Sequence, residues 1–207
     1  MNIEIIAPSA KLLTSRECVE EMVRLAEEAG RCSHRSKAGE NTALPFLCRV
    51  KAMGHLSVLR HINLTVKFVT DRTASHQIVR HSHISWTQES QRYVKYGDKH
   101  AFQFVHPVNT DMGRWMVYGG AIGPLDTACE TYVRLCAEGI PAEEARKVLP
   151  GCMATTLYGT GNAEAWGHFF KMRCDKHAQS DVRALADSLL EQFKDALPGI
   201  YDDLSQF

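Results

Sequence analysis

The chain lacks the features that would place it in several large classes of protein. Its 207 residues hold 24 Lys and Arg against 24 Asp and Glu, so no net charge draws in nucleic acid or an anionic membrane. No apolar run approaches the roughly 20 residues of a membrane span, and the N-terminus is too short and too acidic for a signal peptide. The seven cysteines never stand as C-x-x-C. We therefore expect a cytoplasmic protein with no disulfide framework, no nucleic-acid partner and no membrane partner.

Motifs of the common catalytic sites are also absent. The sequence has no G-x-S-x-G elbow for a serine nucleophile, no G-x-G-x-x-G fingerprint and no P-loop. His81 and His83 could ligate a metal, but no third ligand stands at a recognisable spacing, so we expect no metal site.

The hydrophobic pattern predicts an α+β protein, with mixed helices around a small sheet rich in antiparallel pairs. The length suits a single domain over residues 1–207. We expect strands at 3–7, 61–69 and 152–160, and helices at about 40–53, from residue 70 or 71 to 83, after Asn162 and at 182–197. We also expect a helix that Thr14 caps and Gly30 stops. The remaining expected elements are a turn at 96–98 and a helical region after Asn109, broken at Gly123-Pro124.

A polar stretch from Gln77 to Tyr93 holds two arginines, Arg80 and Arg92, among small hydroxyl and amide side chains. Planar guanidinium groups beside Ser and Gln donors suit a phosphate and a heterocycle. If the preceding helix continues to residue 83, Gln77, Arg80 and His81 share one of its faces. That face is either part of a binding site or an ordinary solvated surface.

The helix expected after Asn162 has an apolar stripe of Trp166, Phe169 and Phe170, and Arg173 continues it. An arginine at the end of such a stripe either reaches out to solvent or points into a cleft. Arg146 could likewise be a surface charge or part of a site.

Four blocks in order resemble the flavin-dependent thymidylate synthases, from Gly54 onwards. They are Gly54-His55-Leu56-Ser57-Val58-Leu59-Arg60-His61, the stretch from Gln77 to Tyr93, Arg146-Lys147-Val148-Leu149-Pro150, and Asn162-Ala163-Glu164 with His168, Arg173 and Ala178-Gln179. The resemblance implies the fold of that family and a homotetramer with active sites at subunit interfaces.

The resemblance also implies site residues. It assigns FAD to Ser57, Arg80, His81, Ser82, His83, Asn162, Glu164 and His168. It assigns the nucleotide to Gln77, Arg80, Gln88, Glu89, Ser90, Gln91, Arg92, Arg146 and Arg173. By the same resemblance Arg173 is the catalytic residue that polarises the uracil ring.

The activity that this resemblance implies is FAD-dependent methylation of dUMP at carbon 5, giving dTMP. Methylene-tetrahydrofolate is the implied carbon donor and NADPH the implied reductant. No cysteine follows a proline, the context of the nucleophile in the folate-only thymidylate synthases. We therefore expect methylation without a thiolate.

The chain departs from the family pattern at four positions. Ser82 replaces the second Arg of Arg-His-Arg, Gln88 replaces a Glu, and Arg60 and Glu164 exchange an acid with a base. We expect Arg60 and Glu164 to face each other near the cofactor. The altered flavin positions leave two alternatives open. One is methylation or hydroxymethylation of UMP or another pyrimidine nucleotide in a specialised pathway, and the other is a nucleotide-binding homologue that has lost catalysis.

Overall fold

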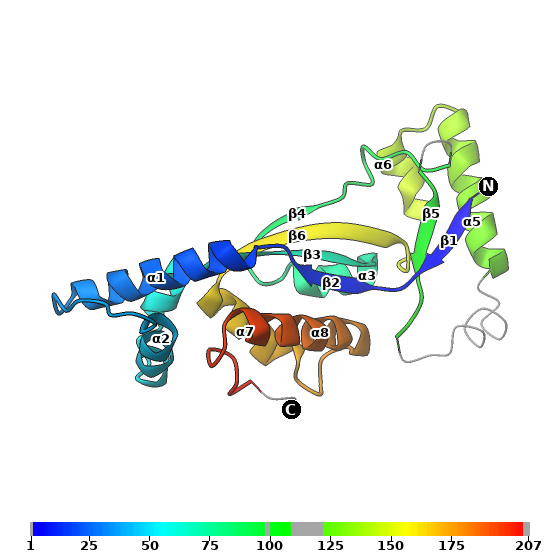
Figure 1. Cartoon of the computed structure of the whole chain (residues 1–207). Helices are drawn as coiled ribbons and strands as arrows, with labels where there is room; N and C mark the ends of the chain where they lie inside the picture. Colours follow the sequence, from blue (N-terminus) through cyan, green and yellow to red (C-terminus); the bar gives the residue numbers. More distant parts are fainter. Residues whose placement is uncertain (1, 98–99, 109–121, 205–207) are drawn as a thin grey trace. The chain divides into compact units, whose positions relative to one another are not determined.

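The computed structural model describes residues 2–97, 100–108 and 122–204 and confirms a mixture of helices and small sheets (Figure 1). The strands are β1 (Ile3–Ile6), β2 (Ser9–Leu12), β3 (Asn63–Asp71), β4 (Ser85–Gln88), β5 (Phe102–Val105) and β6 (Ala154–Asn162). The helices are α1 (Arg16–Cys32), α2 (Ala43–Ala52), α3 (Arg72–Ile78), α5 (Ile122–Ala137), α6 (Ala142–Ala145), α7 (Ala163–Arg173) and α8 (Ser180–Ala196), with 3-10 turns η1 (Leu56–His61) and η2 (Arg146–Val148). Within the described ranges, no helix has the length and apolar character needed to cross a bilayer.

The chain divides into two compact units. The β1 unit takes its residues from Met1–Ser9, Phe68–Ile78 and Thr87–Leu157, and the α7 unit from Ala10–Lys67, Val79–Trp86 and Tyr158–Phe207. Strands β3 and β6 contribute residues to both units. The expectation of one domain over the whole length stays a prediction.

In the β1 unit, β1 and β5 form a two-stranded sheet with Ile3 opposite Phe102 and Ile6 opposite Val105. This pair is parallel, whereas the sequence predicted a small sheet rich in antiparallel pairs. The two strands are far apart in the sequence and need no hairpin, so their pairing direction was not constrained by a turn. The core beside them holds Phe102 and Tyr132, whose rings meet edge-on with centroids 5.7 Å apart.

The larger sheet has the strand order β2-β3-β6-β4. Alternate residues before and along β3 are fully buried, as predicted: Ile62, Leu64, Val66 and Phe68. The Ala163 amide donates to the Ile62 carbonyl at 2.8 Å, and the Arg72 amide donates to the Met153 carbonyl at 3.0 Å. As the residue number increases along β3, the number of the bonded residue on β6 decreases. The two strands therefore run antiparallel, as expected.

The core of the α7 unit is an aromatic cluster between α7 and α8, which lie side by side (Figure 1). Trp166, Phe169 and Phe170 are fully buried, as their spacing predicted. The rings of Phe170 and Phe193 meet edge-on at 4.9 Å, which links the two helices. Such pairs contribute about 1 kcal/mol each beyond the apolar area that they bury.

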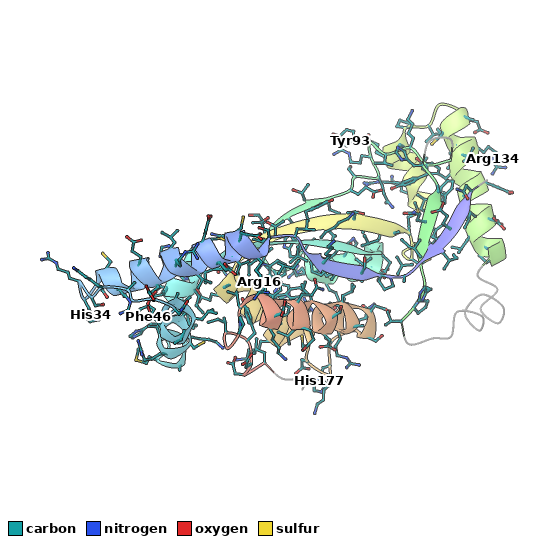
Figure 2. The ribbon with its side chains drawn as sticks, viewed as in Figure 1. Arg16, His34, Phe46, Tyr93, Arg134 and His177 are labelled. Atoms are coloured by element: carbon teal, nitrogen blue, oxygen red, sulfur yellow. The ribbon has the colours of Figure 1, made fainter. Side chains whose placement is uncertain are left out.

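Helix α1 departs from the prediction at both ends. Its N-cap is Ser15, whose hydroxyl accepts from the Cys18 amide, whereas the Thr14 hydroxyl accepts from the Thr65 amide of β3. The bond to the sheet removes Thr14 from its expected role. Gly30 does not stop the helix, which continues to Cys32. A Cβ at residue 30 would stand 2.7 Å from a ring carbon of Phe46, a residue labelled in Figure 2.

Helix α3 is shorter than predicted. Asp71 caps it, as expected, by accepting from the Ala74 amide at 2.7 Å, but the helix ends at Ile78 instead of residue 83. Two adjacent β-branched residues, Ile78 and Val79, lower helix propensity at this point. The prediction that Gln77, Arg80 and His81 share a helical face is therefore wrong, since Arg80 and His81 follow the helix.

The remaining elements lie close to their expected bounds. Strand β6 and helix α8 begin and end within two residues of prediction, and α2 within three. The helical region expected after Asn109 lies outside the described residues as far as residue 121, and Gly123-Pro124 falls in the first turn of α5, where proline is tolerated. The expected turn at 96–98 places Gly97 at a φ of 113°, and Asp98 lies outside the described residues.

Gly159 allows Trp86 to pack on β6, since a Cβ at residue 159 would stand 2.3 Å from a Trp86 ring carbon. We predict that Gly159→Ala lowers the free energy of unfolding by roughly 1–3 kcal/mol through overpacking, measured by urea denaturation. Gly167→Ala on α7 is the control, because its Cβ would make an ordinary contact at 3.6 Å. Equal denaturation midpoints for the two variants would contradict the prediction.

Candidate functional site

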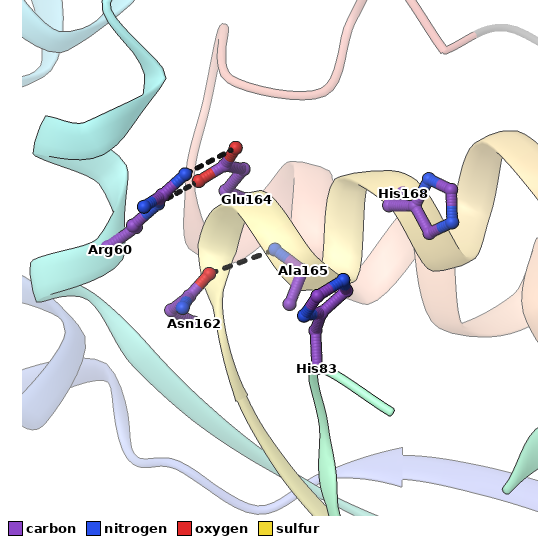
Figure 3. A pocket seen from close by; sticks show the side chains of 6 residues that line it. All are labelled: Arg60, His83, Asn162, Glu164, Ala165 and His168. Atoms are coloured by element: carbon purple, nitrogen blue, oxygen red, sulfur yellow. Dashed lines mark hydrogen bonds and ion pairs between the residues drawn. The ribbon is translucent and has the colours of Figure 1, made fainter. Parts of the chain in front are cut away.

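A pocket of about 400 Å³ in the α7 unit collects side chains from three segments (Figure 3). Its lining residues are Arg60 of η1, His83 before β4, Asn162 at the end of β6, and Glu164, Ala165 and His168 of α7. Four of these, His83, Asn162, Glu164 and His168, belong to the set that the sequence assigned to FAD.

The junction of β6 and α7 positions this pocket. Asn162 ends the strand and caps the helix, as predicted, with its side-chain oxygen accepting from the Ala165 amide at 2.9 Å. The Trp166 indole nitrogen donates to the Leu64 carbonyl at 3.0 Å, which holds the helix against β3. The backbone of the first turns of α7, and with it the start of each side chain at the pocket wall, is therefore held in place.

Arg60 and Glu164 form an ion pair across the pocket wall, which confirms that the exchanged acid and base face each other (Figure 3). A second bond runs from an Arg60 terminal nitrogen to Glu164 at 3.3 Å. The hydrogen bond from Arg60 lowers the pKa of the Glu164 carboxyl. Glu164 also stands in the first turn of α7, where the helix dipole favours a negative charge.

His81 is not one of the residues that line the pocket, and it contacts Arg173. The Arg173 Nε donates to His81 Nε2 at 2.9 Å, and residue His81 is only 7% exposed. Burial, with smaller contributions from Arg173 and His168, lowers the pKa of His81 to about 4. The ring is therefore neutral at pH 7, with Nε2 as an acceptor and the proton on Nδ1. Arg173 does not simply reach out to solvent, since part of its guanidinium is held by a buried partner.

The other residues assigned to FAD lie apart from this pocket. Ser57 lines a separate hollow of about 400 Å³ in the same unit, together with His34, Arg49 and His55. Arg80 and Ser82 are exposed on the segment between α3 and β4.

The residues assigned to the nucleotide fall mainly in the β1 unit, where β4 and the following loop hold them. The Gln88 amide nitrogen donates to the Ser75 hydroxyl at 3.0 Å and to the Thr155 hydroxyl at 3.1 Å. The Glu89 carboxylate accepts from the Tyr96 hydroxyl at 2.6 Å. Gln77 is half-buried near the end of α3, and Ser90 is half-buried after β4.

Arg92 and Arg146 meet at one residue, Glu143. The Arg92 Nε donates to the Glu143 carboxylate at 3.1 Å, and the Arg146 Nε donates to the Glu143 backbone carbonyl at 3.2 Å. Arg72 is a third cation of this group, because burial and then the charge of Arg146 lower its pKa. Two of the guanidinium groups expected to grip a phosphate thus converge within one unit.

Gln91 carries a buried donor without a partner. The residue is 8% exposed, and within the described ranges its side-chain Nε2 has no hydrogen-bond partner. An unsatisfied buried donor costs about 1–3 kcal/mol. A ligand acceptor would remove that cost.

The pocket fits part of a flavin nucleotide. Its volume lies at the small end of the range for ligand sites, so it suits one ring system with an attached polar group better than a whole dinucleotide. The imidazoles of His83 and His168 offer flat surfaces, and the Arg60 guanidinium offers donors for carbonyl or phosphate oxygens. Within the described ranges, no group of three or more His, Cys, Asp or Glu side chains could hold a metal ion.

Sequence reasoning missed Glu143 and Arg72. Glu143 follows Pro141 in the acidic first turn of α6, which by itself indicates only helix capping. Arg72 follows the cap residue Asp71, and only its proximity to Arg146 indicates a site. Neither signal separates a functional residue from a surface charge without the fold.

Comparisons with known proteins give one consistent family. Residues 5–199 match the family model described as thymidylate synthase complementing protein. The flavin-dependent thymidylate synthase of Geobacter sulfurreducens is 38% identical over 173 residues, covering 82% of this chain and 72% of the relative. That of Mycobacteroides abscessus is 33% identical over 197 residues, covering 86% and 78%.

Among solved structures, the fold is similar to that of the UMP/dUMP methylase PolB from Streptomyces cacaoi, bound with 5-Br dUMP. The TM-score is 0.75 at 21% sequence identity, with 96% of this chain and 95% of that chain covered.

The depressed pKa of His81 makes stability depend on pH. Between pH 6.5 and about 4, His81 is protonated in the unfolded chain but stays neutral in the folded chain. The free energy of unfolding therefore falls as the pH falls through this window. We predict that the wild type loses roughly 2 kcal/mol more than His81→Gln between pH 7 and pH 4, measured by urea denaturation. Parallel curves for the two proteins would rule this out.

The Arg60–Glu164 pair predicts a charge-reversal result. Arg60→Glu and Glu164→Arg should each lower the melting temperature, because each places like charges together. The double variant should recover only part of the loss, since an arginine in the first turn of α7 opposes the helix dipole. Thermal melts monitored by circular dichroism measure the melting temperatures. Full recovery in the double variant, or an unchanged melting temperature in either single variant, would contradict the prediction.

Proposed function

The chain belongs to the family of flavin-dependent thymidylate synthases, and we propose that it methylates dUMP at carbon 5 to give dTMP, with FAD as cofactor. Methylene-tetrahydrofolate provides the one-carbon unit, and NADPH provides the hydride. The balanced reaction takes up one proton and releases tetrahydrofolate and NADP⁺. The enzyme is thus a methyltransferase.

The observation that carries this proposal is the meeting of Arg92 and Arg146 at Glu143. A phosphate monoester needs two or more charge-assisted donors that approach from different directions, and two guanidinium groups provide them. The Arg92 side chain is 54% exposed, so its bond to Glu143 is weak and a phosphate can replace it. Gln91 adds a buried donor that lacks a partner among the described residues.

Arg173 is the catalytic residue of the proposal. Methylation at carbon 5 requires electron density on the uracil ring, and a cation at a ring oxygen stabilises the charge that develops there. Burial lowers the pKa of Arg173 without removing its charge, because a guanidinium does not lose its proton in proteins. A charge in a partly buried position acts more strongly than the same charge in water.

Bound FAD supplies the hydride transfer that no side chain can perform. Asn162, His83 and His168 would hold it in the pocket of the α7 unit, and Arg60 would face its polar group. The segment from Asn162 onwards gives Asn162 and His168 a rigid support, since α7 is anchored on β3 through Trp166.

We also propose that the chain assembles as a homotetramer in the cytoplasm. Tyr93 supports the assembly, because its side chain is 77% exposed beside Arg92 (Figure 2), a position that a neighbouring copy would cover. The seven cysteines support the location, since all are free and suit a reducing compartment. Sedimentation equilibrium that gives a monomer mass would contradict the assembly.

Purified protein with FAD should show a flavin absorbance spectrum and should form dTMP from dUMP with NADPH and methylene-tetrahydrofolate. We predict that Arg173→Ala lowers kcat by roughly 10²–10³, measured by product chromatography, with little change in melting temperature. Arg16→Ala, an exposed arginine at the start of α1, is the control and should keep wild-type turnover.

Two outcomes would overturn the assignments separately. A wild-type protein that binds neither FAD nor dUMP, or that turns over UMP faster than dUMP, contradicts the proposed function. Wild-type turnover by Arg173→Ala contradicts only the role of that residue.

A further inference from the structure

We propose that His81 is a positioning residue that acts through Arg173: it fixes the plane of the Arg173 guanidinium so that this group meets the pyrimidine ring. This inference rests on the proposed function. It gives His81 a role in addition to the contact with FAD that the family resemblance implied.

The first support is the hydrogen bond itself. The Arg173 Nε donates to His81 Nε2 at 2.9 Å, between residues that both belong to the α7 unit. The Nε–H bond lies in the guanidinium plane, so an acceptor there sets the direction of the two terminal amino groups. Arg173 is the last residue of α7, and the bond at Nε restricts the rotamers of its long side chain.

The second support is that His81 is itself held in place. Its ring packs edge-on against Phe169 with centroids 4.9 Å apart, and its backbone carbonyl accepts from the Trp86 indole nitrogen at 3.0 Å. The ring is almost fully buried. An acceptor fixed on both its backbone and its ring can orient a flexible partner.

The third support is the distribution of the histidines. His83 and His168 line the pocket, whereas His81 does not, and its Nε2 is already engaged by Arg173. Contact of His81 with a ligand through Nε2 would break that bond. The bond to Arg173 therefore leaves Nε2 unavailable to a ligand.

A neutral partner also has a chemical advantage. A carboxylate at this place would orient Arg173 equally well but would neutralise its charge. An uncharged imidazole orients the guanidinium at Nε without placing a negative charge beside it.

A double-mutant cycle on dUMP binding tests the proposal, with isothermal titration of the full-length protein in the presence of FAD. His81→Leu removes the acceptor and keeps an apolar body against Phe169, and we expect it to weaken dUMP binding about tenfold. Because His81 acts through Arg173, His81→Leu should cause no further loss in an Arg173→Ala background.

Two amide variants control for folding and polarity. The oxygen of His81→Gln falls near the position of Nε2 and should restore binding to within about threefold of wild type. The oxygen of His81→Asn falls nearer Nδ1 and should not. The melting temperature of each variant is measured as well. If the role of His81 were purely structural, dUMP binding would vary with melting temperature and would not separate the Gln variant from the Asn variant.

Each result decides the matter. Additive losses in the cycle, or equal binding by the Gln and Asn variants, would overturn the positioning role while leaving the proposed function in place. Failure of the wild type to bind dUMP would overturn both.

Discussion

The attachment of α7 to β3 is the constraint on which the α7 unit depends. Two hydrogen bonds make it, from the Ala163 amide to the Ile62 carbonyl and from the Trp166 indole to the Leu64 carbonyl. Both acceptors belong to a buried segment, where an unsatisfied carbonyl would be costly, so the bonds are strongly favoured. Because the helix starts at a defined point and in a defined direction, Glu164, His168 and Arg173 follow at fixed positions along it. The pocket and the bond to His81 both depend on this junction.

The arginines of the two units are oriented in two physically different ways. Arg60 and Arg92 each pair with a carboxylate, Glu164 and Glu143, and their side chains are 61% and 54% exposed. Exposed pairs of this kind contribute about 1 kcal/mol or less, so an anionic ligand can compete for either arginine. Arg173 is instead held by the neutral imidazole of His81. The difference fits the proposed function, in which the exposed arginines exchange partners when a ligand arrives and Arg173 keeps its orientation.

Much of the fold follows from local patterns in the sequence. The alternation before and along β3 predicted its buried face, the spacing of Trp166, Phe169 and Phe170 predicted the buried stripe of α7, and Asn162 predicted the start of that helix. The reversed acid and base predicted the pairing of Arg60 with Glu164. Local patterns were less informative where the chain had a competing partner elsewhere. The Thr14 hydroxyl bonds to the sheet, so Ser15 caps α1 instead. Helix α3 ends at Ile78, earlier than predicted, and His81 after it is buried.

The sequence by itself determined the family resemblance, the α+β class, the apolar faces and the kinds of side chain available for a phosphate and a flat ring. Only the tertiary structure decided which of these meet. Residues 81 and 173 are joined by a hydrogen bond although 92 positions separate them, and Arg92 reaches Glu143 across 51 positions. Periodicity reports the direction of a side chain relative to its own helix or strand. The partner that it meets depends on how β3, β4 and β6 pair and on where α7 attaches, and those are properties of distant segments that no local pattern contains.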